Sequence, residues 1–203
     1  MHPTPNALRT HKWFVLRLLV ILGLIMGASS PAIADYAFVV IDVPGASVTL
    51  AFGMNAEEQV VGAFNDGTGP HGFLRDRDGT LTVIDVPGAS STEAFAINPR
   101  GQIVGLFAGA FGFLREPSGE FTTIDVPGPS FTEALGINPK GDIVGAFNGA
   151  FGGRRGFLVD VRGTFTPFDA PGASFTEAWD INTAGQIVGV FDDAAGTHGF
   201  LLT

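Results

Sequence analysis

The hydrophobic positions of this chain fall in short runs, none of them longer than a β-strand. In residues 79–118 the apolar runs cover 81–86, 93–97, 102–107 and 111–115, and each ends at turn-forming residues. None of the runs has the 3.6-residue period of an amphipathic helix, and β-branched and aromatic residues dominate them. The pattern therefore predicts four strands joined by tight turns.

Two of these turns have a recognisable type. The segment 86–89 reads Val-Pro-Gly-Ala, which fits a type II turn because the third residue of that turn needs a positive φ. The segment 98–101 reads Asn-Pro-Arg-Gly, with asparagine first, proline second and glycine fourth, which indicates a type I turn between paired strands.

The same arrangement returns four times. The phrase Ile-Asp-Val-Pro-Gly starts at Ile41, Ile84 and Ile124 and returns as Phe-Asp-Ala-Pro-Gly at Phe168, with spacings of 43, 40 and 44 residues. Two more markers keep this rhythm: an asparagine seven residues before a glycine (Asn55, Asn98, Asn138, Asn182) and a Gly-Phe-Leu triplet (Gly72, Gly112, Gly156, Gly199). Four strands in 40–44 residues is the size of a β-propeller blade.

We therefore predict an all-β fold, a β-propeller of four four-stranded blades, for residues 35–203. The repeat units are approximately 36–78, 79–118, 119–162 and 163–203. The first strand is expected at 38–43, and each unit is expected to form a blade complete in itself. The ring would then close by packing of the fourth blade against the first, without a shared strand. A β-solenoid of the same repeats is the alternative, although solenoid coils are usually shorter.

Residues 1–34 predict a secretory signal peptide. Arg9, Lys12 and Arg17 precede an uncharged apolar run over 18–28, and Ala-Ile-Ala at the end of the segment predicts cleavage after Ala34. An uncleaved membrane anchor is the alternative, but the run is short against the roughly 20 residues that span a bilayer. We expect a secreted or periplasmic protein that meets the membrane only through this leader, before cleavage.

Composition excludes several classes of protein. The 203 residues include no cysteine, so a disulfide scaffold and a cysteine-ligated metal site are excluded. The formal net charge of −9 argues against a nucleic-acid binder. No nucleophile elbow or phosphate-binding loop is present, and His71 and His198 offer too few ligands for a metal. We therefore predict no catalytic residue, no cofactor and no metal site.

The repeat markers resemble those of the HAF family of probable extracellular repeat proteins of bacteria. The matching segments are Ala-Ile-Asn at 96–98, Gly-Gln-Ile-Val-Gly at 101–105 and His-Gly-Phe-Leu at 71–74 and 198–201. The resemblance covers essentially all of the chain after the leader. It implies export and a repeat fold, and it implies no particular activity.

Some repeat positions depart from the pattern. Unit one has Glu58 where the other units have glycine in the hairpin turn, and units two and three replace the motif histidine by Phe111 and Arg155. The recurrent aspartate of the Ile-Asp-Val-Pro-Gly phrase is expected to accept backbone N–H groups in the turn that follows it. A ring of these four carboxylates is the alternative.

Candidate ligand-binding residues come from the Thr-Glu-Ala phrase and from unit four. Glu93, Glu133 and Glu177 share one repeat position, and if their strand lines the channel they crowd its axis and raise one another's pKa values. Trp179 and Asp180 follow, where the other units have Phe or Leu and then Ala or Gly. Indole faces bind sugars and cations. The alternatives are glutamates paired locally, a tryptophan that fills a core slot and an aspartate that faces water.

Together these features predict a non-enzymatic binding or scaffolding module for an extracellular glycan, peptide or partner protein. The unit could also assemble with copies of itself into a homo-oligomer. The alternative is a polysaccharide hydrolase or lyase that uses axial carboxylates, which needs two carboxyl groups about 5–10 Å apart.

Overall fold

The computed structural model describes residues 37–126, 131–149 and 152–203, so the predicted leader and its cleavage point lie outside the described residues. The chain divides into two compact units, 1–40 and 41–203, and every described strand belongs to the second, which we call the repeat domain. The described residues contain no α-helix, and among them nothing helical is long and apolar enough to cross a membrane.

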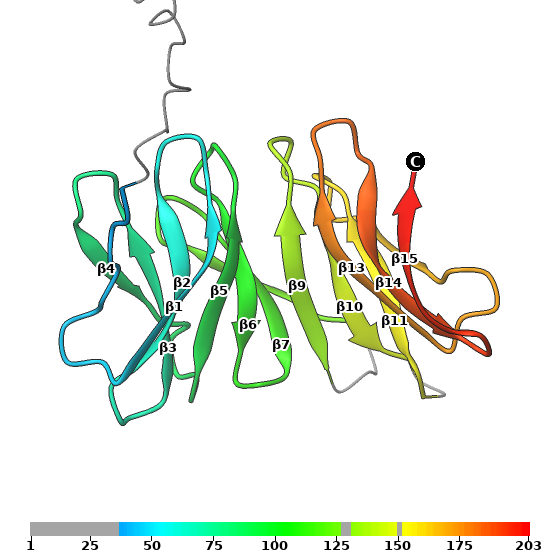
Figure 1. Ribbon diagram of the computed structural model, residues 1–203, viewed down its shortest axis with the longest axis horizontal. Coiled ribbons are helices and arrows are strands. Elements are labelled where there is room, and N and C mark those ends of the chain that lie inside the picture. The colour runs from blue at the N-terminus through cyan, green and yellow to red at the C-terminus, as the bar shows by residue number, and fades with distance from the viewer. Residues whose placement is uncertain (1–36, 127–130, 150–151) are drawn as a thin grey trace, which may run out of the picture. The chain divides into compact units, whose positions relative to one another are not determined.

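Fifteen strands form four sheets that follow one another along the chain (Figure 1). Each sheet is an antiparallel meander in which sequence neighbours are hydrogen-bonded. The strands are β1 (Val48–Met54), β2 (Val60–Asn65), β3 (Pro70–Arg75) and β4 (Leu81–Ile84) in blade one; β5 (Thr92–Ile97), β6 (Ile103–Phe107), β7 (Phe111–Arg115) and β8 (Phe121–Ile124) in blade two; β9 (Thr132–Ile137), β10 (Ile143–Asn148), β11 (Arg154–Val159) and β12 (Phe165–Phe168) in blade three; and β13 (Phe175–Ile181), β14 (Ile187–Asp193) and β15 (Gly196–Leu202) in blade four.

The four sheets pack face to face as β-propeller blades, which confirms the predicted all-β architecture. The first strands of successive blades (β1, β5, β9 and β13) lie against one another, whereas the fourth strands β4, β8 and β12 do not. The blades therefore converge at the edge formed by the first strands, which we call the inner edge. A solenoid is excluded because each repeat forms a separate antiparallel sheet.

A hydrophobic core fills each joint between two blades. At the first joint Val61 and Ile84 of blade one pack with Ala94, Ile97 and Phe113 of blade two. The next two joints repeat this set with equivalent residues, among them Val104 with Ala134 and Ile137, and Val144 with Ala178 and Ile181. Blades two and three thus bury both faces, one against the blade before and the other against the blade after, whereas blades one and four each bury a single face.

The repeated asparagines link the blades in series. The Nδ2 of Asn55 donates to the backbone carbonyl of Asn98 at 3.2 Å, that of Asn98 to Asn138 at 3.1 Å, and that of Asn138 to Asn182 at 3.3 Å. Each asparagine Oδ1 also accepts backbone N–H groups of its own hairpin turn, as Asn98 does from Arg100 at 3.0 Å. One side chain therefore closes a turn and holds the next blade, and we call this series the asparagine ladder.

The repeated glycine marks a close approach within each blade. A Cβ at Gly105 would lie 1.9 Å from the carbonyl oxygen of Glu93, and a Cβ at Gly62, Gly145 or Gly189 would meet the equivalent carbonyl at 1.9–2.0 Å. No side chain fits there, so glycine is required at this position of the second strand, where it pairs with the first strand of the blade.

The predicted turns have the expected geometry where they are described. Ala89 N donates to Val86 O at 3.0 Å and Gly88 has a φ of 81°, as a type II turn requires. The equivalent turn of the third repeat falls on residues 127–130, outside the described residues. Glu58 adopts a φ of 62°, the left-handed conformation that glycine takes in the other hairpin turns.

The repeat units do not coincide with the blades, which corrects one expectation. The strand that ends in Ile-Asp-Val-Pro-Gly opens each sequence unit but pairs with the preceding blade, as β4 pairs with β3. The Pro-Gly turn consequently joins two blades rather than two strands of one sheet. Residues 38–43, expected as the first strand, form no strand, and blade four has three described strands instead of four.

The expected closure of the ring is also not seen. Among the described residues, blade four makes no substantial contact with blade one, and the two lie at opposite ends of the row of blades (Figure 1). Residues that are buried at the joints are exposed at the ends: Val188 is 44% exposed and Met54 67%, whereas their equivalents Val104 and Ile97 are buried. The repeat domain is an open array with two unpartnered faces.

The asparagine ladder predicts a difference between two identical substitutions. Asn98→Ala leaves buried turn and carbonyl groups unpaired, so we expect it to lower the free energy of unfolding by about 3 kcal/mol. Asn182→Ala removes an exposed side chain that holds no following blade, and we expect a loss of about 1 kcal/mol or less. Urea unfolding followed by circular dichroism measures both. Equal losses would show that the inter-blade bond contributes nothing.

Candidate functional site

The three predicted glutamates lie at the inner edge of the array. Glu93 is the second residue of β5, Glu133 of β9, and Glu177 the third of β13, so one glutamate comes from each of three successive blades. The bulged residue of each first strand follows two positions later, at Phe52, Phe95, Leu135 and Trp179. A bulge bends a strand and redirects its side chain, and here it repeats at one level of the inner edge.

Arg154 joins two of the glutamates. Its Nη2 contacts the carboxylate of Glu133, and its Nε lies 3.1 Å from Oε2 of Glu177. The guanidinium also lies over the ring of Phe131, 4.9 Å from the centroid. The side chains of Arg154, Glu133 and Glu177 are 19%, 17% and 19% exposed, so the cluster is largely shielded from water.

Burial raises the pKa of Glu133 above its ordinary value. Desolvation is the largest cause, Arg154 opposes it, and the nearby charges of Glu177 and Glu93 add to the rise. The charges of Glu177 and Glu93 therefore reach Glu133 through space. The strands of three blades bring together carboxylates that are 40 or more residues apart in the sequence.

Trp179 and Asp180 lie on the exposed side of blade four. The indole is 53% exposed, so Trp179 does not fill a core slot, and the carboxylate of Asp180 accepts the N–H of Ile181 at 2.8 Å. A Cβ at Gly136, the position equivalent to Asp180, would lie 2.9 Å from the Cα of Asp180 in the next blade. No described blade follows the fourth, which is why this position has room for a charged side chain.

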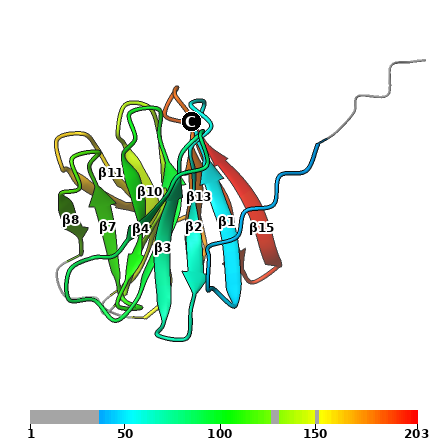
Figure 2. The same ribbon diagram turned by 90° about the vertical axis from the view of Figure 1, so that its left-hand side faces the viewer.

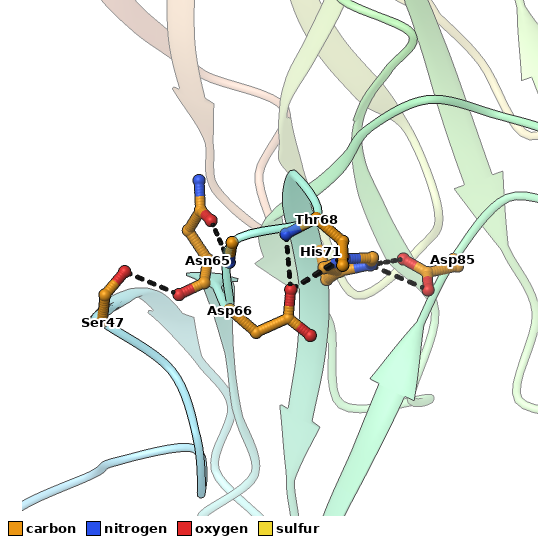
Figure 3. A network of polar contacts seen from close by, with 7 residues as sticks. Ser47, Asn65, Asp66, Thr68, His71 and Asp85 are labelled. Atoms are coloured by element: carbon orange, nitrogen blue, oxygen red, sulfur yellow. Dashed lines mark hydrogen bonds and ion pairs between the residues drawn. The ribbon is translucent and has the colours of Figure 1, made fainter.

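The two histidines of the repeat domain lie in different blades and pair locally. His71 contacts Thr68 at 2.8 Å and the carboxylate of Asp85 at 3.0 Å (Figure 3), and His198 contacts Asp193 at 3.2 Å. No group of three or more potential metal ligands is found among the residues that the structure describes.

In blades one and three the recurrent aspartate pairs with the neighbouring strand instead of the turn that follows it. Asp85 accepts from His71 on the neighbouring strand, and Asp169 accepts from Arg155 at 2.8 and 3.1 Å. These carboxylates instead pair the third and fourth strands of a blade. They belong to the outer strands, so they also form no ring at the inner edge.

A second concave region lies between blades two and three, away from the glutamates. It encloses about 470 Å³, and charges of both signs line it, among them Arg100, Lys140, Glu116 and Asp160. It offers no aromatic platform comparable with Trp179, and we treat the inner edge as the candidate site.

Arg154 is the residue of this site that sequence reasoning missed. Its repeat position holds Pro70, Ala110 and Thr197 in the other blades, so the arginine is a departure peculiar to blade three. The signal was present in the alignment of the repeats, but the surrounding glycines gave the segment the pattern of a loop.

Comparisons with known proteins show the fold. No protein-family model and no curated protein sequence matches the chain. A streptogramin B lyase structure matches 80% of this chain with a TM-score of 0.51 and 16% identity, and a putative gluconolactonase matches 78% with a TM-score of 0.49 and 16% identity. The chain spans 57% of the lyase and 61% of the gluconolactonase. At this identity the likeness to the lyase structure shows the β-propeller fold alone.

The raised pKa of Glu133 predicts a pH dependence of stability. A carboxyl group whose folded pKa is raised stabilises the fold below its unfolded pKa, near 4.5, and this contribution is lost as the pH rises through the folded pKa. We expect native protein to lose stability relative to Glu133→Gln as the pH rises above about 4.5. Thermal unfolding measures this, with Glu57→Gln, at an exposed site, as the control for net charge. Parallel curves for native protein and Glu133→Gln would contradict the assignment.

Proposed function

We propose that this protein is an exported, non-enzymatic binding module whose inner edge recognises an extracellular glycan, peptide or partner protein. The observation that carries the proposal is the combination, at that edge, of an exposed indole with carboxylates from neighbouring strands. Trp179 offers an apolar face of the kind that binds sugars and cations, and Glu177 and Asp180 lie on the same strand.

The net charge of the protein limits which chemical class of ligand can bind. The chain carries 20 acidic and 11 basic residues, and Arg154, the cation of the site, is already held by two glutamates. An anionic ligand would be repelled by the remaining carboxylates, so a neutral or positively charged ligand fits best.

The arrangement of Arg154 favours binding over catalysis. A glycosidase needs one carboxyl group free to donate a proton and another free to attack or to activate water. Here one guanidinium contacts both Glu133 and Glu177, which fixes them as its partners. The raised pKa of Glu133 beside Glu177 is the observation that keeps polysaccharide cleavage as the second candidate.

Export is part of the proposal. The leader over 1–34, with cleavage after Ala34, and the resemblance to the HAF family both support a secreted or periplasmic location. The cleaved chain would retain Trp179 as its single tryptophan, because Trp13 lies in the leader.

Tryptophan emission and one substitution test the proposed site. The exported protein is screened against a glycan array and a panel of polysaccharides and peptides, and any ligand found is titrated while the emission of Trp179 is recorded. We expect the emission to shift on binding, and Trp179→Phe to weaken binding about tenfold with an unchanged circular dichroism spectrum.

A matched control is Phe111→Leu, which alters an exposed aromatic side chain on β7, outside the inner edge. If Trp179→Phe binds as tightly as the control, the ligand binds elsewhere. Turnover of a polysaccharide that disappears in Glu133→Gln would replace the binding function by the hydrolase or lyase function.

A further inference from the structure

The connector before blade one has the geometry of a connector between two blades. Between blades one and two, Val86 N donates to Thr92 Oγ1 at 3.1 Å, and between blades three and four Ala170 N donates to Thr176 Oγ1 at 3.1 Å. Val43 N donates in the same way to Thr49 Oγ1 at 3.2 Å, and Ala46 N closes the same turn on Val43 O at 3.1 Å. The chain therefore enters blade one as if it came from the outer strand of a preceding blade.

The residues in front of this connector have the sequence of an outer strand. The segment 38–42 reads Phe-Val-Val-Ile-Asp, and its equivalents are 81–85 (Leu-Thr-Val-Ile-Asp), 121–125 (Phe-Thr-Thr-Ile-Asp) and 165–169 (Phe-Thr-Pro-Phe-Asp). These three form β4, β8 and β12, but Phe38 and its neighbours form no strand, and the side chain of Phe38 is 95% exposed.

In the part of the chain that the structure describes, blade four has no corresponding strand. Among the described residues β15 pairs with β14 alone, so its other edge carries unpaired backbone N–H and C=O groups. Such an edge can pair with a strand of another chain. A cavity of about 150 Å³ opens beside β15 and is lined by Phe200, Leu201 and Leu202 together with Phe168–Pro171.

We infer that residues 38–41 of a second copy of this chain form the fourth strand of blade four, so that two copies join head to tail. Residues 38–41 of the same chain cannot form this strand in the open array. Val43 is hydrogen-bonded to Thr49 of blade one, and blade one does not reach blade four. A second copy supplies the strand without any change in the packing of the blades. The joint would bring Asp180 of the proposed site against Gly53 of the second copy, so the two proposals share this end of blade four, and cross-linking tests the joint without any ligand.

The side chains on the two sides of the joint complement each other. Phe121 packs on Phe113 with ring centroids 5.6 Å apart, and Phe165 on Phe157 at 5.1 Å; Phe38 of the second copy is their equivalent over Phe200. In the same register Asp42 of the second copy meets His198, as Asp85 meets His71 at 3.0 Å (Figure 3).

The two unpartnered faces of the array, on blades four and one, are also complementary to each other. Val188 and Leu201, exposed at the end of blade four, are equivalent to buried or half-buried residues that pack on the next blade, and Ala51 and Met54 of blade one are equivalent to residues that receive them. The Nδ2 of Asn182 donates to Gln186 at 2.8 Å, as that of Asn98 does to Gln102, and its second N–H would reach the Asn55 carbonyl of the second copy and continue the asparagine ladder.

The inner-edge glycines obey the same pairing. A Cβ at Gly53 would lie 3.1 Å from the Cα of Ala96, and one at Gly136 would lie 2.9 Å from the Cα of Asp180, so each of these two contacts has a glycine on one side. A contact between Asp180 and Gly53 of the second copy would likewise have a glycine on one side. Two copies joined at both ends give eight blades, within the usual range of β-propellers, and a head-to-tail interface that closes forms a ring.

Cysteine cross-linking tests the joint, because the native chain contains no cysteine. Leu74 pairs with Thr82 and Leu158 with Thr166, which places Val39 of one copy opposite Leu201 of the other, within reach of a disulfide. The full chain is expressed as Val39→Cys and, separately, as Leu201→Cys; the two proteins are unfolded together, refolded and oxidised. We expect a mixed disulfide dimer at least tenfold above the yield of the control pair Val39→Cys with Val161→Cys.

Both substituted residues are exposed, so each variant is expected to keep the circular dichroism spectrum of native protein. Sedimentation equilibrium of native protein should give twice the chain mass, independent of concentration. Three results would overturn the inference: a monomeric mass, a mass that rises continuously with concentration, or a disulfide formed within one chain by the double variant Val39→Cys/Leu201→Cys. A mixed dimer no more abundant than the control pair would overturn it as well.

Discussion

The bond from one asparagine side chain to the backbone carbonyl of the next asparagine is the interaction on which the array depends. Asn98 is buried, its Oδ1 holds its own hairpin turn, and its Nδ2 reaches the turn of the following blade. Since donor and acceptor belong to the same residue type, the bond can be repeated at every joint. The apolar cores lie between sheets whose ends these bonds join.

The ends of the array explain the irregular residues of blade four. A position that is buried between two blades must be small or apolar, as Gly136 and Val144 are. The same position in the last blade meets solvent, so Asp180 is tolerated and Val188 is exposed. Repeat proteins commonly change their terminal units in this way, because a terminal unit has one neighbour instead of two. A departure from the repeat therefore marks a change of neighbour as readily as a ligand site.

The sequence predicts the strands and turns well and the blade boundaries poorly, for a physical reason. Residues 111–115 form a strand as expected, and the segment 86–89 forms the expected type II turn, because both depend on local conformational preferences. Periodicity gives the length of a repeat but not its starting point, and a Pro-Gly turn has the same local geometry within a sheet as between two sheets. The sequence also does not predict the pairing of Arg154 with Glu177, because these residues lie in two different blades.

The charge of the inner edge is uneven because its glutamates are repeated and its arginine is not. A glutamate at one repeat position becomes several carboxylates where the blades are closest together, and the pKa of Glu133 rises in consequence of burial and of these neighbours. A single arginine, present in one blade, contacts two of the carboxylates, offsets one of their two negative charges and leaves Glu93 outside its ion pairs. The backbone of the inner edge is thus repeated while its charge is not. A ligand at the proposed site would therefore meet different side chains at each blade, with Trp179 and Asp180 in blade four alone.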